Sequence, residues 1–400
     1  MNMDAQEYDV STLLTVKLIQ IIIGIFLFIA LLNGEQTLAL LTFLILVMVS
    51  GVKLWSRACA NGLIWNARLD RQRLFPGEKL TFTVRAENTT WLPVWLQIGI
   101  ATEGPFQPVA DTAALTQESG LLWYQQVDMQ WELVAQRRGV YHIGMTSLCA
   151  GDLLGFFPHD QQVHDLRQVL VYPRLIPLIG LGVQKQDVWG TPGAKHPIHD
   201  PVYLLGTREY HHSQPAKYIH WKASARYNRL QEKLFEPTTQ EKVLLVLDVT
   251  QFTRHQTADT FEQTLEVAAS VGVQLLQKGQ SVGIVTNGRV IDGSPGMLPI
   301  ASGPRQSQAL LELLAKLLME TTENILTVLM RDMNLPWGVS CFHLAYCYDD
   351  TTAAVSNLFQ HRHLPAIFVM GQLSAETDGM SKGIRGKWYQ LEDLCLNTKK

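Results

Sequence analysis

Residues 242–249 read KVLLVLDV, an apolar run that ends in Asp248 before Val249. Strands that are covered on both faces have apolar residues at successive positions, so this run predicts a buried strand of a parallel sheet. The next segment, TFEQTLEVAASVGVQLLQKG over 260–279, has the 3.6-residue period of an amphipathic helix and ends in glycine. A strand over 281–288 and a helix over 305–319 continue the alternation. We therefore expect an open α/β, Rossmann-type domain over residues 241–400.

Polar residues follow three of the predicted strands. They are Asp248 and Thr250 after the first, Thr286 and Asn287 after the second, and Asp349 and Asp350 after the third. Ligands of open α/β sheets bind at the carboxyl ends of the strands, so these residues mark the expected ligand edge. Neither common type of glycine-rich phosphate loop follows the first strand, which disfavours a nucleotide site.

The middle of the chain has a period of two. KLTFTVRAEN, over Lys79–Asn88, alternates apolar and polar residues, with turn signals before and after it. Similar short runs continue to about residue 175. This spacing predicts an antiparallel β-sandwich over residues 58–180, in which we find no catalytic constellation.

Two apolar runs, over 13–32 and 37–55, precede the sandwich, and the polar turn NGEQ separates them. Each is about 20 residues long, the length of one bilayer crossing. The acidic start MNMDAQEYD differs from the basic start of a signal peptide. We expect a transmembrane helical hairpin over residues 1–57. A buried soluble hairpin is the weaker alternative, since neither run has a polar face.

Lysine and arginine residues set the expected orientation. The turn has none, whereas five cations lie at the end of the second run or after it: Lys53, Arg57, Arg68, Arg71 and Arg73. The positive-inside rule then places both termini and the soluble domains in the cytoplasm, with the protein multi-pass in the plasma membrane. Five scattered cysteines without a CxxC pair read as free thiols in a reducing compartment, which agrees. The net charge of −3 gives no reason to expect nucleic-acid binding.

A segment over 181–240 contains GTREYHHSQPAKYIHWKASARYNRLQEKLFEP, from Gly206 to Pro237. Ser213 and Pro215 predict the start of a helix that runs to about Tyr227. As an enzyme site, the segment would use His220 as an acid–base group.

Glu236 would then orient His220, and Ser213 or Ser224 would be the nucleophile, although no nucleophile motif surrounds either serine. As a docking surface, the segment would offer cations around Trp221, because arginine and tryptophan are enriched at interface hot spots. As a structural lock, it would pack Trp221 and Ile219 between domains, with Arg208 or Arg226 paired to Glu236. The last two interpretations are compatible with each other.

The order of these parts and the residues of the segment resemble the bacterial domain-of-unknown-function family number 58. Its signature is Arg-x-Tyr, Gly-Asp, an Arg, Ile-His-Trp-Lys-x-x-Ala-Arg and a later Glu. The matching residues here are Arg208, Tyr210, Ile219, His220, Trp221, Lys222, Ala225, Arg226 and Glu236. Ser213-Gln214 replaces the Gly-Asp pair, and Lys217 replaces the arginine that follows it. The set expected to bind a partner or to lock the domains is Arg208, Tyr210, Lys217, His220, Trp221, Lys222, Arg226 and Glu236.

The C-terminal domain is similar to a von Willebrand factor A domain. Such domains often hold Mg²⁺ through Asp-x-Ser-x-Ser after the first strand, a loop threonine and a later aspartate. Here the first element reads Asp248-Val249-Thr250-Gln251-Phe252, in which phenylalanine offers no ligand. The resemblance implies a degenerate, MIDAS-like Mg²⁺ site of Asp248, Thr250 and Asp349, with Ser302 or Ser307 as the loop hydroxyl.

The resemblance also implies a partnership with a MoxR-type AAA+ ATPase. We expect a non-enzymatic, membrane-anchored scaffold or adaptor on the cytoplasmic face, working with such an ATPase in protein assembly or envelope maintenance. The alternative is a metal-dependent ligand-binding sensor that uses the MIDAS-like site.

Overall fold

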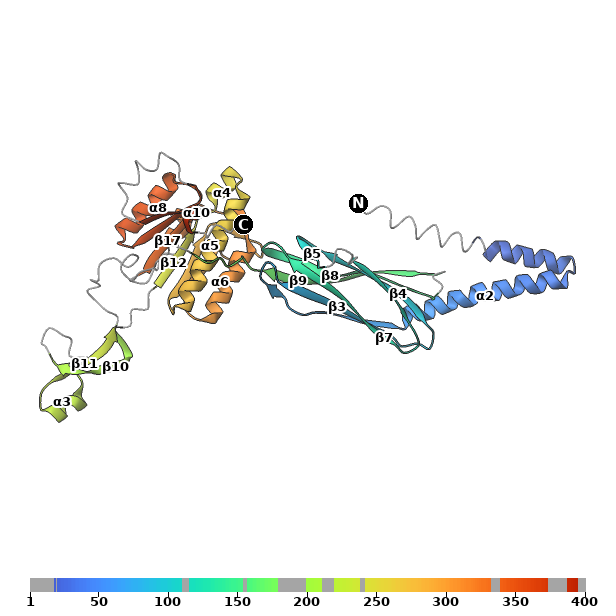
Figure 1. Cartoon of the computed structure of the whole chain (residues 1–400), viewed down its shortest axis with the longest axis horizontal. Coiled ribbons are helices and arrows are strands. Elements are labelled where there is room, and N and C mark those ends of the chain that lie inside the picture. Colours follow the sequence, from blue (N-terminus) through green and yellow to red (C-terminus); the bar gives the residue numbers. More distant parts are fainter. Residues whose placement is uncertain are drawn as a thin grey trace. The chain divides into compact units, whose positions relative to one another are not determined.

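The computed structural model of this 400-residue chain describes residues 18, 20–109, 115–153, 157–178, 199–210, 219–237, 242–331, 339–372 and 387–394. Over these residues the protein is a mixed α/β multidomain chain with one long apolar N-terminal helix and several sheets (Figure 1). The chain divides into two compact units, Met1–Val171 and Tyr172–Lys400.

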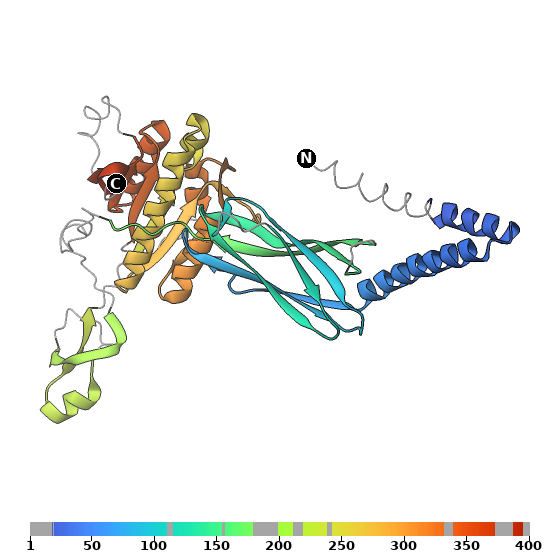
Figure 2. The same cartoon turned by 45° about the vertical axis from the view of Figure 1, so that its right-hand side comes forward.

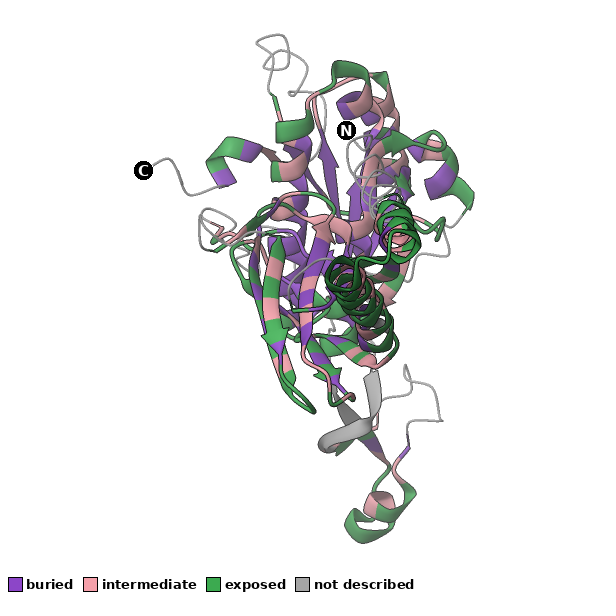
Figure 3. Cartoon of the chain, turned by 90° about the vertical axis from the view of Figure 1, so that its right-hand side faces the viewer, coloured by how far each residue is buried: buried purple, intermediate pink, exposed green. Residues whose placement is uncertain are grey.

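The N-terminal unit begins with two apolar helices. The first covers Gln20–Leu32, and α2 covers Gln36–Asn61. Within the described residues, one helix is long and apolar enough to cross a membrane, over Gln36–Cys59, with a mean hydropathy of 2.2. Its side chains are mostly exposed, as the green helices of Figure 3 show. The second predicted apolar run is therefore a long helix, whereas the described part of the first is shorter than one bilayer crossing.

The sandwich of the N-terminal unit has a four-stranded and a five-stranded sheet. The first has the order β1 (Leu63–Leu69), β3 (Lys79–Asn88), β7 (Gln126–Ala135), β5 (Phe106–Pro108). The second has the order β2 (Arg73–Leu74), β9 (His159–Val171), β8 (Gly139–Gly151), β4 (Val94–Thr102), β6 (Thr116–Leu121). Every second residue of β3 is buried, as its alternating sequence predicts. Inward side chains of both sheets form one core, in which Phe82 lies against Trp131.

The last turns of α2 are fixed to the sandwich. Trp55 Nε1 donates a hydrogen bond of 3.0 Å to the carbonyl of Pro93. The buried Ser56 hydroxyl bonds the carbonyl of Phe157 and lies 3.0 Å from Nδ1 of His159. Only Gly62 separates α2 from β1, so the helix enters the sandwich without a linker.

The C-terminal unit contains a six-stranded sheet. Its order is β15 (Met297–Ala301), β13 (Ser281–Thr286), β12 (Lys242–Leu247), β17 (Val339–Ala345), β18 (Ala366–Met370), β19 (Lys387–Gln390). All neighbours pair in parallel except β13 and β15, which are antiparallel. The first strand of this sheet in the sequence, β12, thus lies in its middle, and later strands are added on both sides of it. This is the doubly wound arrangement.

Helices cover both faces of this sheet. One face packs on α7 (Ile325–Arg331) and α8 (Asp350–His361) through a shared apolar cluster. The other lies against α5 (Ala258–Gln277) and α6 (Pro304–Lys316), which run side by side in Figures 1 and 2. A Cβ at Gly272 would lie 2.3 Å from a Leu310 methyl group, so this glycine allows α5 and α6 to approach closely.

The remaining described elements of the unit are short: α4 (Thr250–His255), α10 (Leu391–Leu394) and the pair β14 (Gly288–Val290) and β16 (Leu317–Thr321). The predicted helix over 305–319 therefore ends three residues early, because Leu317 pairs with Val290 instead. A separate two-stranded sheet joins β10 (His199–Glu209) to β11 (Gln231–Pro237), with α3 (Trp221–Tyr227) between them in the chain.

Candidate functional site

The carboxyl edge of the sheet brings the predicted polar residues together. Asp248 follows β12, Asn287 follows β13, and Asp349 is the N-cap of α8 after β17. Because β13, β12 and β17 are parallel neighbours, these three positions lie at the same edge. Asp248 and Asn287 are both buried.

Asn287 is the centre of this edge. Its Oδ1 accepts a hydrogen bond of 2.8 Å from the backbone N–H of Val249. Its Nδ2 donates to Asp248 Oδ1 at 2.9 Å, to Thr250 Oγ1 at 2.8 Å and to the carbonyl of Glu323 at 3.2 Å. The Val249 N–H needs an acceptor, so it fixes which end of the amide is oxygen.

The NH₂ group of Asn287 therefore stands among three oxygen atoms, which is the environment that a hard cation prefers. It already bonds two of the three side chains predicted to hold Mg²⁺, Asp248 and Thr250. Phe252, at the third position of the Asp-x-Ser-x-Ser pattern, is fully buried against Phe261. Within the described residues, no group of three or more His, Cys, Asp or Glu side chains is arranged to hold a metal ion. The residues present thus fit Mg²⁺ poorly.

One atom of the edge, in contrast, favours a bound cation. Asp248 Oδ2 is buried and has no hydrogen-bond partner, which is costly for a carboxylate oxygen. A cation or a water molecule there would satisfy it. The predicted loop hydroxyls do not reach the site: β15 runs antiparallel, Ala301 pairs with Val282 at the amino end of β13, and Ser302 and Ser307 follow Ala301. The expectation that either serine completes the metal site was wrong.

The half-buried Asp349 and the buried His343 complete the polar edge. Burial raises the pKa of Asp349, but hydrogen bonds from Thr351 at 2.5 Å and from the N–H of Thr352 at 2.9 Å hold it below its usual value. Burial lowers the pKa of His343 to about 4, against the attraction of Asp248 and Asp349. Neither ring nitrogen of His343 has a hydrogen-bond partner, so this histidine is held neutral beside two carboxylates.

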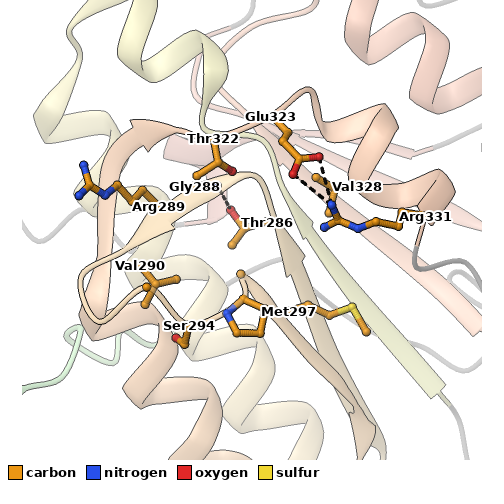
Figure 4. A pocket seen from close by; sticks show the side chains of 13 residues that line it. Thr286, Gly288, Arg289, Val290, Ser294, Met297, Thr322, Glu323, Val328 and Arg331 are labelled. Atoms are coloured by element: carbon orange, nitrogen blue, oxygen red, sulfur yellow. Dashed lines mark hydrogen bonds and ion pairs between the residues drawn. The ribbon is translucent and has the colours of Figure 1, made fainter.

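A cavity of about 440 Å³ adjoins this edge. Thr286 and Gly288, which flank Asn287, line it together with the 293–297 loop and residues of 322–331. In Figure 4 the paired Glu323 and Arg331 lie on one side of the cavity, and Arg289 lies on the other. Arg331 Nη1 is 3.0 Å from Glu323 Oε1, and Arg289 Nη1 is 3.0 Å from Glu320 Oε2. Both arginines are thus paired with carboxylates, which reduces the charge that the cavity offers to an anion. Among the residues that line this cavity, the sequence pattern predicted only Thr286 at the ligand edge.

The signature segment forms a compact element around α3. His220 is the N-cap of α3, and its Nδ1 accepts a hydrogen bond of 3.0 Å from the N–H of Ala223. Ser224 Oγ donates to the carbonyl of His220 at 3.1 Å and accepts from the N–H of Gln231 at 2.8 Å. Of the side chains in the enzyme interpretation, His220 and Ser224 are thus engaged in positioning the helix. The described helix begins at Trp221, and the predicted start at Ser213 and Pro215 lies outside the described residues.

A charged pair lies at the base of this element. Arg208 donates from Nε to Oε1 of Glu232, which lies opposite it in the register of β10 and β11. Glu232 is buried and forms a bridge with Ile219, which is also buried. The prediction named Glu236 as the acidic partner, but the side chain that Arg208 contacts is that of Glu232. The side chain of Glu236 is outside the described set, as is Lys217.

The outer surface of α3 has no buried residue. Trp221 is 70% exposed, and Tyr227 is 61% exposed. The exposed cations around them are Lys222, Arg226 and Arg229. Tyr210 is half-buried next to the element, where its N–H donates to the carbonyl of Leu230 at 2.9 Å. The structural-lock interpretation, in which Trp221 packs between the sandwich and the α/β domain, stays a prediction.

A family of known proteins matches the part of the chain that contains the signature residues. The family described as "Protein of unknown function DUF58" matches residues 206–332, which confirms the resemblance predicted from the sequence. The uncharacterized protein YeaD of Bacillus subtilis is 24% identical over 254 residues, covering 62% of this chain and 61% of that protein. The chain thus matches less than two thirds of the length of this relative.

Similarities to solved structures are short. Alpha-2-macroglobulin from Escherichia coli aligns with a TM-score of 0.24 and 19% identity, over 28% of this chain and 17% of that one. A FixG-related protein from Vibrio parahaemolyticus aligns with a TM-score of 0.20 and 12% identity, over 28% of this chain and 96% of that one. Similarity at this level carries no argument about function.

Proposed function

We propose that this chain, whose residues 206–332 match family DUF58, is a non-enzymatic membrane-anchored scaffold that docks a partner protein through the outer surface of α3. The observation that carries the proposal is the exposure of Trp221 and Tyr227 on a helix with three exposed cations. Exposed tryptophan, tyrosine and arginine are the residues most enriched at interface hot spots.

The way α3 is held supports docking. The cap at His220 and the bonds of Ser224 fix the helix to β11, so its side chains are presented on a rigid base. A pre-organised surface loses less conformational entropy when it binds. The partner surface that complements it is acidic around an apolar pocket for Trp221. The family resemblance suggests a MoxR-type AAA+ ATPase as that partner.

Membrane anchoring is supported by the length and hydropathy of α2. In this proposal the Gln20–Leu32 helix and α2 form a hairpin in the bilayer, and the lysine and arginine residues after α2 keep the soluble units cytoplasmic. The doubly wound sheet supports the von Willebrand factor A-like interpretation of residues 241–400.

The test is a detergent pull-down of tagged full-length protein from its native membrane, read by mass spectrometry. We expect an AAA+ ATPase with wild type and its loss with Trp221→Ala/Arg226→Ala. The matched control is Met330→Ala/Arg289→Ala, which removes an equally exposed apolar and cationic pair in the same unit. Equal recovery with all three proteins would contradict docking through α3. Recovery of no ATPase from wild type would contradict the partner.

A second function is favoured by the unpartnered Oδ2 of Asp248 and by the 440 Å³ cavity that Thr286 and Gly288 line on either side of Asn287. We propose, as the alternative, a sensor in which this edge binds Mg²⁺ and an acidic ligand. Calorimetry of the full-length protein with MgCl₂ tests it, with Asp248→Asn as the matched variant. Micromolar binding that is lost in Asp248→Asn would support the sensor, and absence of heat at millimolar Mg²⁺ would refute it.

A further inference from the structure

Three loops of the sandwich meet at the end where α2 enters it. Strand register places the start of β1 beside the end of β3, and the end of β3 beside the start of β7. The start of β4 lies beside the ends of β6 and β8, and the end of β8 lies beside the start of β9. The described residues 89–93, 122–125, 152–153 and 157–158 therefore lie at one end of the sandwich, and α2 joins β1 at that same end.

Exposed apolar side chains concentrate on these loops. Every large aromatic residue that is exposed on the described sandwich is found there: Trp91 at 72%, Trp123 at 61% and Tyr124 at 69%. Leu122 and Leu153 add two exposed leucines to the same end. Exposed aromatic residues carry a cost in water unless another surface covers them.

These loops have a defined conformation. The buried Asn88 donates from Nδ2 to the carbonyls of Leu92 at 2.7 Å and Leu122 at 2.9 Å. Its Oδ1 accepts from the N–H of Thr90 at 2.9 Å, and the N–H of Tyr124 donates to the carbonyl of Thr90 at 3.2 Å. One asparagine thus holds both aromatic loops together.

The position of these loops along α2 indicates that lipid headgroups cover them. The first side-chain hydrogen bond from α2 to the sandwich is made by Trp55, to the loop that carries Trp91. At 1.5 Å per residue, the helix rises about 29 Å between Gln36 and Trp55, which matches a hydrocarbon core of about 30 Å. A helix that crosses the bilayer from Gln36 therefore reaches the headgroup region where the aromatic loops begin.

We infer that Trp91, Trp123 and Tyr124 insert into the headgroup region of the bilayer and seat the sandwich on the membrane. Tryptophan and tyrosine are enriched there because their rings prefer the acyl boundary and their polar atoms prefer water. Lys53 and Arg57, on the adjoining turns of α2, supply cations at the level of the lipid phosphates. The inference rests on the proposed membrane anchoring by α2, and it adds a second contact that fixes the tilt of the sandwich.

The test uses full-length protein reconstituted in phosphatidylcholine and phosphatidylglycerol vesicles. Difference spectra between wild type and Trp91→Phe or Trp123→Phe isolate the emission of each tryptophan. We expect lipids brominated near the top of the acyl chain to quench both at least twofold, and aqueous iodide to quench them weakly. Trp221→Phe is the matched control, because Trp221 is equally exposed and lies on α3 in the other unit. Its emission should respond to iodide and not to brominated lipid.

Flotation of the vesicles separates the two ideas. Protein that floats with vesicles while Trp91 and Trp123 respond only to iodide would overturn the inference and leave the anchor intact. Protein that does not float would overturn the anchor and the inference together. Loss of flotation in Trp91→Phe or Trp123→Phe is not expected, since α2 is unchanged.

Discussion

Replacing Asn287 with alanine tests whether one amide holds the carboxyl edge of the sheet. The variant leaves the buried N–H of Val249 without its acceptor, which costs about 1–3 kcal/mol. It also removes a hydrogen bond to the carboxylate of Asp248, which contributes about 1.5–3 kcal/mol. Allowing for water that enters the space, we expect a loss of about 3–5 kcal/mol in local stability.

Amide hydrogen exchange of the full-length protein measures this loss where it occurs. Since 1.4 kcal/mol is a factor of ten, exchange of the amides of Val249 and the adjacent ends of β12 and β13 should accelerate roughly 100- to 3,000-fold. Asn324→Ala is the control, because this exposed asparagine accepts one bond, from Leu326, and should cost about 1 kcal/mol. An acceleration below fivefold in Asn287→Ala would refute the reasoning.

Asn287→Asp then tests whether the amide occupies the place of a cation. It replaces the NH₂ group with an oxygen atom between Asp248 and Thr250, so two carboxylates face each other. We expect this variant to be destabilised at neutral pH and to be stabilised by MgCl₂, with no effect of MgCl₂ on wild type. If MgCl₂ stabilised wild type equally, the amide of Asn287 would not occupy the place of a cation, and the sensor would be favoured.

Three further changes have defined outcomes. Arg208→Ala leaves the buried carboxylate of Glu232 unpaired and should cost about 2 kcal/mol, seen as faster exchange in β10 and β11 with the six-stranded sheet unaffected. The folded pKa of His343 is about 4 and its usual value is 6.5, so the unfolding free energy should fall, by up to about 3 kcal/mol, as pH drops from about 6.5 to about 4. His343→Leu should remove this pH dependence of the unfolding free energy, measured by urea unfolding. An unchanged pH dependence would assign it to another group. In Gly144→Ala, a Cβ 1.9 Å from the carbonyl of Asp165 should force β8 and β9 apart and lower the thermal midpoint by several degrees, whereas Gly120→Ala has open space and serves as the control.

Local sequence patterns predicted the elements that depend on local periodicity. The first six residues of the apolar run at 242–249 form β12, and the amphipathic run at 260–279 forms most of α5. The pattern failed at Leu317–Met319, because those residues continue a helical period and yet pair with β14. Pairing with a distant strand outweighed a weak local preference.

The edge residues Asp248, Thr250 and Asp349 could be predicted because parallel strands align their carboxyl ends. The role of Asn287 could not be, since which amide reaches which carboxylate depends on side-chain geometry. The serines at 302 and 307 were misplaced for a different reason: β15 is antiparallel, and its direction is not encoded in its own five residues. The pairing of Arg208 with Glu232 depends on a register that shifts twice along β10 and β11.

The hydrogen bonds around Asn287 also affect how fast the chain deamidates. Gly288 follows Asn287, and an asparagine before glycine is prone to deamidation because the next backbone nitrogen can attack the side-chain carbonyl unhindered. Here the amide of Asn287 is fixed by its bonds to Val249 and Asp248, and the N–H of Gly288 donates to Thr286 Oγ1 at 3.1 Å. In the folded edge the attacking nitrogen and the side-chain amide are therefore both engaged in hydrogen bonds that the attack would have to break. Deamidation of Asn287 should therefore occur mainly when the edge opens, and each event adds one negative charge to the chain.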